Sequence, residues 1–348
     1  MTMLGRFTSR LDIAGGSIDM THGSGGRATA QLVSELFARH FSNELLAQGN
    51  DGASFDVAAG RMVMSTDGHV VSPLFFPGGD IGALSVHGTI NDVAMMGARP
   101  LYLSAAFIIE EGYPLRDLER IVKSMAEASR LACVPIVTGD TKVVEKGNAD
   151  GIFITTTGIG IVPPGIEVSG DKAKPGDKII LSGSIGDHGI AILSKRANLE
   201  FETEIVSDTA ALHGLVADML AAVPSLRCLR DPTRGGLGTT LNEIAHQSRV
   251  GMRLIERAIP IKPEVRAACE LLGLDPLYIA NEGKLISVCP PDCADTLLAA
   301  ITQNPLGRDA AIIGEVVSDS NGFVQMETEF GGNRIVDWLV GEQLPRIC

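Results

Sequence analysis

The sequence lacks the features that mark several classes of protein. Aromatic residues make up only 4% of its 348 residues, and there is a single tryptophan. No apolar run approaches the ~18–20 residues that a membrane-spanning helix needs, so we expect no membrane partner. The first residues show no basic stretch followed by an apolar one, as a secretory signal would. We therefore expect a cytoplasmic protein.

Basic residues are also scarce. Lys and Arg number 29 against 42 Asp and Glu, which gives a net charge of -13. This balance argues against binding nucleic acid or anionic lipid through a basic face. It does not exclude phosphate binding, because a glycine-rich backbone and a metal ion can bind phosphate without net positive charge.

The cysteines form no disulfide framework, and their scatter fits reduced thiols. The pair Cys289 and Cys293 lies in CPPDC with no histidine nearby, so a strand end and a turn are favoured there over a metal site. The six cysteines are Cys133, Cys228, Cys269, Cys289, Cys293 and Cys348.

What the sequence does have is typical of an α/β protein of two domains. Apolar residues reach 45%, and there are 40 glycines. A segment rich in proline and glycine, residues 162–178, separates two sets of alternating helix and strand patterns. We expect an α/β (α+β) chain with mixed sheets flanked by helices. Its parts are a loose N-terminal extension (1–20), two domains (21–165 and 166–335) and a mobile tail (336–348).

The periodicity of apolar residues predicts most of the elements. Helices are expected at 28–45, 80–96, 115–131, 209–222, 236–246, 263–272 and 294–302. Strands are expected at 61–66, 101–109, 134–138, 152–162, 178–181, 284–288 and 311–317.

Three carboxylates stand where a nucleotide–metal site is expected. Asp67 (in STDG) and Asp140 (in GDTK) follow predicted strands, and Asp92 lies on a predicted helix. Ligands of α/β proteins gather beyond strand ends, and carboxylates there suit Mg²⁺. Lys142 would add positive charge. Each Asp alone could equally be a helix cap or a turn residue.

Three further segments carry candidate residues. HGSGG (residues 22–26) precedes a helix and could bind an anion through its backbone, or be a plain turn. RDPTRGG places Arg234 before a helix, as an anion ligand or a surface ion pair, with Asp231 as a cap in the second case. In NEGK, Glu282 at the mouth of a strand is a general base facing a cleft, or a turn residue.

The last residue, Cys348, is chemically unusual. A thiol at the end of a mobile tail would be exposed and able to move between sites. The terminal carboxylate disfavours its thiolate, whereas Arg346 could offset this. The alternative is an incidental exposed cysteine.

These motifs, taken in order, resemble a known family. HGSGGRATAQL, GTINDVAMMGARP, VTGDTKVVEKG, GDHG, RDPTRGG, NEGK and the terminal PRIC are similar to those of the carbamoyl dehydratases of hydrogenase maturation. The resemblance covers nearly all of residues 22–348. Its broader pattern is shared with the aminoimidazole ribonucleotide synthetase superfamily, which includes selenophosphate synthetase and thiamine monophosphate kinase.

The resemblance implies a fold and a reaction. The fold would be that of aminoimidazole ribonucleotide synthetase, dimerising through N-terminal domains that bind ATP and Mg²⁺. The carbamoyltransferase HypF would place a carbamoyl group on Cys348. The chain, acting as a lyase, would use ATP to dehydrate it to a thiocyanate. Cyanide would then pass to iron on the HypC–HypD complex, for the nickel–iron hydrogenase site.

The resemblance also assigns roles. Cys348, Glu282 as base and Lys142 as a charge stabiliser would be catalytic, with Pro345 and Arg346 steering the tail. Asp67, Asp92 and Asp140 would bind the metal. The nucleotide would contact His22, Gly23, Gly25, Gly26, Asp67, Asn91, Asp92, Gly139, Asp140, Thr141 and Arg234.

Other functions compete with this interpretation. Selenophosphate synthetase typically has a Cys or selenocysteine near the N-terminal glycine-rich segment, whereas the first cysteine here is Cys133. The synthetase and the thiamine phosphate kinase give no reason for a terminal cysteine. A non-catalytic nucleotide-sensing scaffold would bind ATP without turnover that depends on Cys348. A thiol redox carrier would tolerate loss of Asp140 and Glu282.

Overall fold

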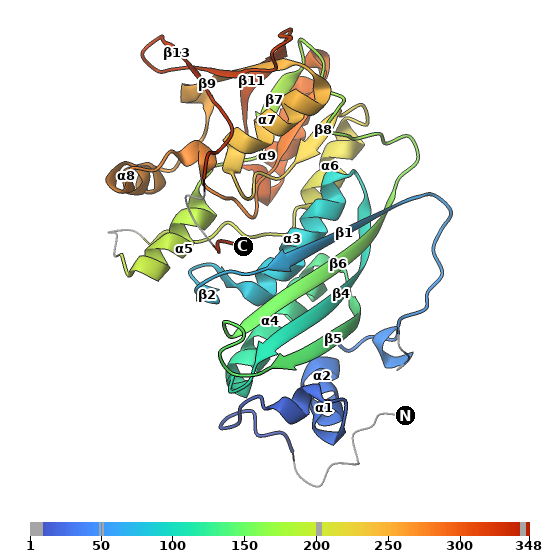
Figure 1. Cartoon of the computed structure of the whole chain (residues 1–348). Coiled ribbons are helices and arrows are strands. Elements are labelled where there is room, and N and C mark those ends of the chain that lie inside the picture. The colour runs from blue at the N-terminus through green and yellow to red at the C-terminus, as the bar shows by residue number, and fades with distance from the viewer. Residues whose placement is uncertain (1–9, 49, 51, 200–203, 342–345) are drawn as a thin grey trace.

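The structure, a computed structural model, describes residues 10–48, 50, 52–199, 204–341 and 346–348. Two sheets lie at opposite ends of the molecule, and the helix α3 (Ile81–Met95) extends from one toward the other (Figure 1). Each sheet contains both parallel and antiparallel pairs, which confirms the expected α/β fold with mixed sheets.

The first sheet has four strands and one covered face. Helices α3 and α4 (Leu115–Ala132) lie on that face. Strand β4 buries every second side chain against them, as Leu103, Phe107 and Ile109 show. The strands, in order across the sheet, are β1 (Arg61–His69), β6 (Ile152–Val162), β4 (Arg99–Glu110) and β5 (Ile136–Val144).

The covering helices pack closely because of a glycine. A Cβ at Gly82 of α3 would lie 2.4 Å from the backbone oxygen of Ile121 in α4, so a larger residue would push the helices apart. Asp80 caps α3 by accepting the N–H of Ala83 at 3.0 Å. This helix passes directly over β1 and β6, and therefore places Asp92 near both.

The other face of this sheet is open. It carries the exposed side chains of Met62 and Met64 from β1 and of Ile108 from β4. Asp140 and Lys142 of β5 belong to the same face by the alternation of side chains along paired strands.

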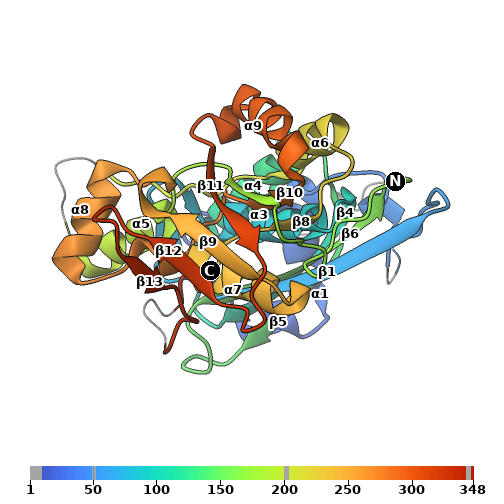
Figure 2. The same cartoon turned by 90° about the horizontal axis from the view of Figure 1, so that it is seen from above.

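The second sheet has seven strands with helices on both faces. Figure 2 shows α6 (His213–Ala222) and α9 (Ala294–Gln303) together on one side, and α7 (Gly236–Ser248) packs on the other. Two more helices, α5 (Asp187–Ala197) and α8 (Pro263–Leu272), contact each other. The strands, in order, are β13 (Asn333–Ile335), β12 (Val324–Glu327), β9 (Gly251–Ile255), β11 (Ala311–Val317), β7 (Lys178–Leu181), β10 (Ile286–Cys289) and β8 (Cys228–Arg230).

The two halves share an apolar cluster. Val93 and Met95, at the end of α3, pack in the same cluster as Leu215 and Met219 of α6. The end of α3 is thereby anchored to the second half. The segment that joins the two halves packs in the same apolar cluster. None of the helices in the described ranges is long and apolar enough to cross a membrane.

Several sequence expectations are wrong in detail. Strands β1 and β5 continue through Asp67 and Asp140 instead of ending before them. Their glycines are paired within the sheet: a Cβ at Gly139 would lie 2.3 Å from the backbone oxygen of Ala105, so this glycine permits close strand approach. The strands expected at 61–66 and 134–138 therefore end too early.

The expected loose arm is packed where it is described. Ile18 is only 1% exposed, and its N–H bonds to the oxygen of Tyr113 at 2.8 Å. The next expected helix is present in pieces, α1 (Arg27–Leu32), a π-helical turn (Val33–Phe37) and α2 (Ala38–His40). Helix α5 and strands β8, β9, β12 and β13 were not expected, and α6 begins at His213. A two-stranded hairpin, β2 (Phe75–Phe76) and β3 (Gly79–Asp80), precedes α3.

Candidate active site

The end of the chain lies between the two halves of the molecule. Figure 1 shows the C-terminus beside α3 and α5. A main-chain oxygen of Cys348 accepts the N–H of Val70 at 3.0 Å, and the carbonyl of Arg346 accepts that of Ser72 at 3.1 Å. Ile347 is 3% exposed within the core cluster of the first half. We call residues 346–348 in this position the seated tail.

The seated tail corrects the expectation of an exposed thiol. Cys348 is only partly exposed. Burial raises the pKa of its thiol, and the nearby Glu282 raises it further, whereas Arg234 acts in the opposite direction. The thiol is therefore uncharged when seated. Arg346, which was expected to favour the thiolate, instead pairs with Asp150. Pro345 lies outside the described residues.

Glu282 is buried next to the tail. It is 4% exposed, and its Oε1 finds no hydrogen-bond partner among the described residues. Burial raises its pKa well above the ordinary range, and the carboxylates of Asp231 and Asp208 raise it further. A carboxyl group of this kind takes up a proton readily, which is what a general base requires.

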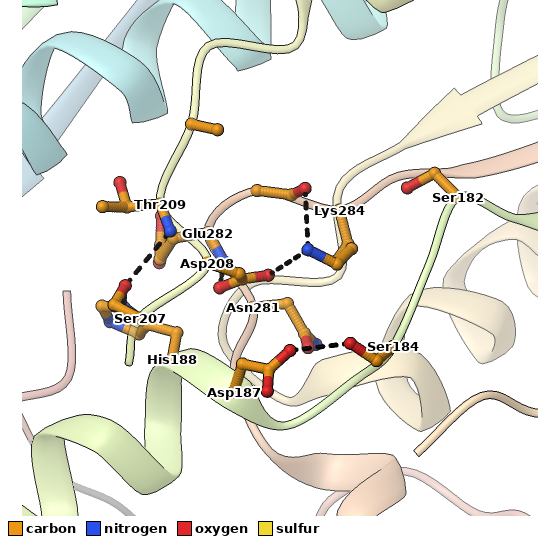
Figure 3. Close-up of polar contacts among 12 residues, drawn as sticks. Ser182, Ser184, Asp187, His188, Ser207, Asp208, Thr209, Asn281, Glu282 and Lys284 are labelled. Carbon is orange, nitrogen blue, oxygen red and sulfur yellow. Dashed lines mark hydrogen bonds and ion pairs between the residues drawn. The ribbon is translucent and has the colours of Figure 1, made fainter. Parts of the chain in front are cut away.

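The backbone around Glu282 is fixed by its neighbours. Its N–H donates to Oδ1 of Asp208 at 3.1 Å, and Asp208 forms an ion pair with Lys284 at 3.2 Å. Figure 3 shows this pair and the approach of the segment 207–209 to the NEGK loop. The side chain of Glu282 is thus presented by a rigid loop, although the residue belongs to no helix or strand.

Asn91 was expected to contact the nucleotide, but its amide is engaged by backbone. Nδ2 donates to the carbonyls of Ala210 at 3.0 Å and Glu282 at 3.3 Å, and Oδ1 accepts the N–H of Leu212 at 2.7 Å. The residue is 1% exposed. Asn91 therefore joins α3 to the loop that carries Glu282.

Asp67, Asp92 and Asp231 form an acidic group near Glu282. Asp92 accepts the hydroxyl of Ser65 at 2.7 Å, and burial together with Asp67 raises its pKa. Burial, then Asp92, raises the pKa of Asp231 to about 7. From the sequence, Asp231 in RDPTRGG was expected only as a helix cap and not as a site residue. Its position in that motif was the feature that could have indicated a role.

The third expected metal ligand lies elsewhere. Asp140 is on β5, three strands from β1, which is roughly 14 Å at the usual strand spacing. It points to the open face, whereas Asp67 lies against Gly88 of α3 on the covered face. Within the described residues, no three His, Cys, Asp or Glu side chains could hold one metal ion. One chain therefore does not assemble Asp67, Asp92 and Asp140.

Asp140 instead belongs to a second group on β5. Lys142 pairs with it at 2.6 Å and lowers its pKa. The HGSGG segment packs on the same strand: a Cβ at Gly23 would lie 2.8 Å from Val143. His22 is 8% exposed, and its Nδ1 accepts the N–H of Asp19. The structure thus separates the expected residues into two groups, one at the tail and one on β5.

Comparison with known proteins defines the class first. Residues 49–162 match the family model described as AIR synthase related protein, N-terminal domain, and residues 174–327 match the corresponding C-terminal domain. The chain is therefore a two-domain protein of the AIR synthase superfamily.

The more specific family follows from closer relatives. Carbamoyl dehydratase HypE of Azotobacter vinelandii is 69% identical over 98% of this chain and 100% of its own length. A structure of the hydrogenase maturation protein HypE in complex with ATP superposes with a TM-score of 0.92, at 52% identity, covering 94% of this chain and 99% of that one. A HypE–HypF complex gives a TM-score of 0.79 at 49% identity, covering 88% and 99%. The chain belongs to the HypE family of hydrogenase maturation proteins.

Proposed function

We propose that this protein uses ATP to dehydrate a carbamoyl group carried on Cys348 to a thiocyanate, which supplies cyanide for a nickel–iron hydrogenase. The single observation that carries this proposal is the seating of Cys348 beside Glu282, an unpaired buried carboxyl with a raised pKa. The names of the relatives and the ATP complex of one of them support it.

The chemistry requires two steps. The carbamoyl oxygen is a poor leaving group, so it attacks the γ-phosphorus of ATP; ADP departs, and one of the two N–H protons is released to solvent. The second step removes the remaining N–H proton, breaks the C–O bond and forms C≡N, with phosphate leaving. Phosphoryl transfer depends on positioning and charge stabilisation more than on covalent catalysis by the protein.

The residues near the tail suit these demands. We assign acceptance of the N–H proton to Glu282, because its carboxyl is near enough to Cys348 to raise the pKa of the thiol. Arg234 supplies the nearby positive charge that both the phosphoryl group and the developing anion need. Because Ile347 is buried and Cys348 is only partly exposed, the seated tail limits the access of water to a reactive intermediate.

Asp67 and Asp92 suit Mg²⁺. Mg²⁺ is commonly held by one or two carboxylates together with substrate phosphates, so two acidic side chains suffice. Burial raises the pKa of Asp92 and the charge of Asp67 raises it further, so a cation near these two carboxylates would be stabilised. When bound, Mg²⁺ orients the phosphates and neutralises their charge.

Replacing Asp92 tests this assignment. The Asp92→Asn variant should need about 10- to 100-fold more Mg²⁺ for half-maximal ATP-dependent product formation, because an amide oxygen is a weaker ligand than a carboxylate. The measurement is a Mg²⁺ titration at fixed ATP. Asp117→Asn, on the surface of α4, is the control and should titrate like the native chain. A native titration for Asp92→Asn would remove Asp92 from the metal set.

The group on β5 is proposed to bind the nucleotide at the interface of a homodimer. The open face of the first sheet carries exposed Met62, Met64 and Ile108 beside Asp140 and Lys142. A second copy packed on this face would bury these side chains and bring its own β5 group to the interface. We propose that Lys142, Gly139 to Thr141 and the HGSGG segment bind ATP there.

Partners follow from the same reaction. HypF would deliver the carbamoyl group, as supported by the complex that a related HypE forms with HypF. The HypC–HypD iron scaffold would receive the cyanide. These steps and the protein itself are assigned to the cytoplasm.

The test is the mass of the C-terminal peptide that contains Cys348. The protein is incubated with HypF, carbamoyl phosphate and an ATP analogue whose γ-phosphoryl group cannot be transferred, so that the carbamoyl group is loaded but not dehydrated. It is then separated from HypF and nucleotide and divided into samples with and without fresh ATP and Mg²⁺. The peptide should carry one carbamoyl group without ATP and lose one water only with it. A peptide that stays unmodified with active HypF would contradict the proposed function. So would one that keeps its carbamoyl group with ATP.

A further inference from the structure

We propose that His188 is a positioning residue that holds the seated tail in place by donating a hydrogen bond from Nε2 to the carbonyl of Ile347. The inference deepens the proposed function, on which its second assay rests, by assigning the contact that decides when Cys348 is at the site. From the sequence alone, His188 in the GDHG motif could equally be a loop residue or a ligand.

His188 lies at the start of α5 and is completely buried. Its Nε2 is 2.8 Å from the oxygen of Ile347, and its Nδ1 is 2.7 Å from Oγ of Ser207. The ring of Phe76 packs edge-on against the imidazole, with centroids 5.6 Å apart. Both ring nitrogens are therefore engaged, and the ring is confined by an aromatic neighbour.

The carbonyl of Ile347 determines which nitrogen carries the proton, because a carbonyl oxygen can only accept and Nε2 must therefore donate. Oγ of Ser207 accepts the N–H of Thr209 at 3.1 Å, which leaves its own hydrogen free to point at Nδ1. Burial lowers the pKa of His188, so the ring is neutral and has a single N–H. With Nδ1 accepting, that N–H is on Nε2 and points at the tail.

The segment that orients His188 also orients the proposed base. Ser207 holds the imidazole, and the next residue, Asp208, accepts the N–H of Glu282 at 3.1 Å. Figure 3 shows Ser207 beside His188 and Asp208 beside Lys284. The N–H of Ser207 bonds to the carbonyl of Pro77 at 2.8 Å, which fixes the segment to the first half. One rigid segment therefore serves both the tail and the base.

The contact with His188 is suited to holding a tail that must also leave. The main-chain oxygens of Arg346 and Cys348 accept hydrogen bonds from backbone N–H groups, and that of Arg346 also accepts one from an arginine. The carbonyl of Ile347 accepts its hydrogen bond from the buried imidazole of His188. Losing this donor would leave a buried carbonyl without a partner when the tail is seated. We expect the seated population to fall about 10-fold relative to the released one.

The experiment measures release of the tail directly. The rate at which iodoacetamide alkylates Cys348 is followed by peptide mass, with exposed Cys133 in the same molecule as an internal reference. His188→Leu should raise the Cys348 rate about 10-fold and leave that of Cys133 unchanged. His188→Gln, which keeps an N–H near the position of Nε2, should stay close to the native rate. His246→Gln, on the surface of α7, is the control for loss of a histidine.

Two results would overturn the proposal. One is a native Cys348 rate in His188→Leu, and the other is equal acceleration in the Leu and Gln variants, which would indicate general loosening. If His188→Leu fails to fold, Ser207→Ala replaces it. Ser207→Ala keeps the imidazole ring but removes the hydroxyl that helps to fix its tautomer. The alkylation rate of Cys348 should therefore rise by a smaller factor than in His188→Leu. A native alkylation rate in Ser207→Ala would also contradict the proposal.

A second assay separates this inference from the proposed function. In His188→Leu, transfer of the carbamoyl group from HypF should proceed at or above the native rate, while ATP-dependent loss of water should slow about 10-fold. Alkylation needs neither ATP nor HypF. Suppose that Cys348 is alkylated faster in His188→Leu but neither this variant nor the native protein forms thiocyanate. The proposed function would then be contradicted, whereas the role of His188 in holding the tail would still be supported. Equal slowing of both steps would contradict that role.

Discussion

Replacing Cys348 by serine or alanine is expected to abolish thiocyanate formation completely, while ATP binding and stability stay close to native. Sulfur is the atom that carries the carbamoyl group, and a serine hydroxyl is not ionised near neutral pH, so it cannot replace the thiol as an acceptor. The measurement is the mass of the C-terminal peptide after incubation with HypF, carbamoyl phosphate and ATP.

The structure explains why the same change should be harmless to the fold. The contact of Cys348 with Val70 uses a main-chain oxygen, which serine and alanine retain. The side chain is only partly buried, so the free energy of unfolding should change by less than about 1 kcal/mol. Cys133→Ser, which removes an exposed thiol far from the tail, is the matched control and should make product normally. Thiocyanate formed by the Cys348→Ser chain would refute the role of the terminal thiol.

Local sequence pattern predicted the covered parts of the fold well. Helix α4 was expected within one residue of its observed ends, because its apolar residues repeat at the helical period. Strand β11 was expected at its observed bounds from its short, mostly apolar run. The strands that contain Asp67 and Asp140 were predicted too short, because the sequence alone does not distinguish a glycine paired within a strand from a glycine that ends a strand. Only the pairing of Gly68 with Thr155 and of Gly139 with Ala105 distinguishes the two cases.

The candidate site could be predicted only in part, for a related reason. Cys348 and Glu282 lie in recognisable motifs, so sequence alone could name them. Asp208 and His188 act through contacts with residues more than 70 positions away, and no local pattern reveals such contacts. The tail was expected to be free because it has no period of its own. It is seated through backbone bonds to residues 70–72, which any sequence could form.

Glu282→Gln is expected to stop the reaction after carbamoyl transfer. Glutamine keeps the size of the side chain but cannot accept the N–H proton, so the ATP-dependent loss of water should slow by about 10²- to 10⁴-fold. Transfer from HypF does not use this carboxylate and should proceed. The C-terminal peptide should therefore accumulate with its carbamoyl group in place, and the rate of its conversion is read by mass over time.

The pH dependence of the native chain gives an independent check. Burial and neighbouring carboxylates raise the pKa of Glu282, and a base acts only when deprotonated. Conversion should therefore be slow at pH values just above the ordinary carboxyl range and rise as pH passes through the raised pKa. Glu270→Gln, on the exposed side of α8, should keep both the native rate and this profile.

The alternative base is Asp231, whose pKa of about 7 also suits proton transfer. The two carboxyls can be separated because they interact: removing the charge at Asp231 lowers the pKa of Glu282. If Glu282 is the base, Asp231→Asn should convert the peptide at a reduced but measurable rate, with its rise shifted to lower pH. If Asp231 is the base, Asp231→Asn should lose conversion and Glu282→Gln should keep it, which would move the proton transfer from the NEGK loop to the RDPTRGG loop.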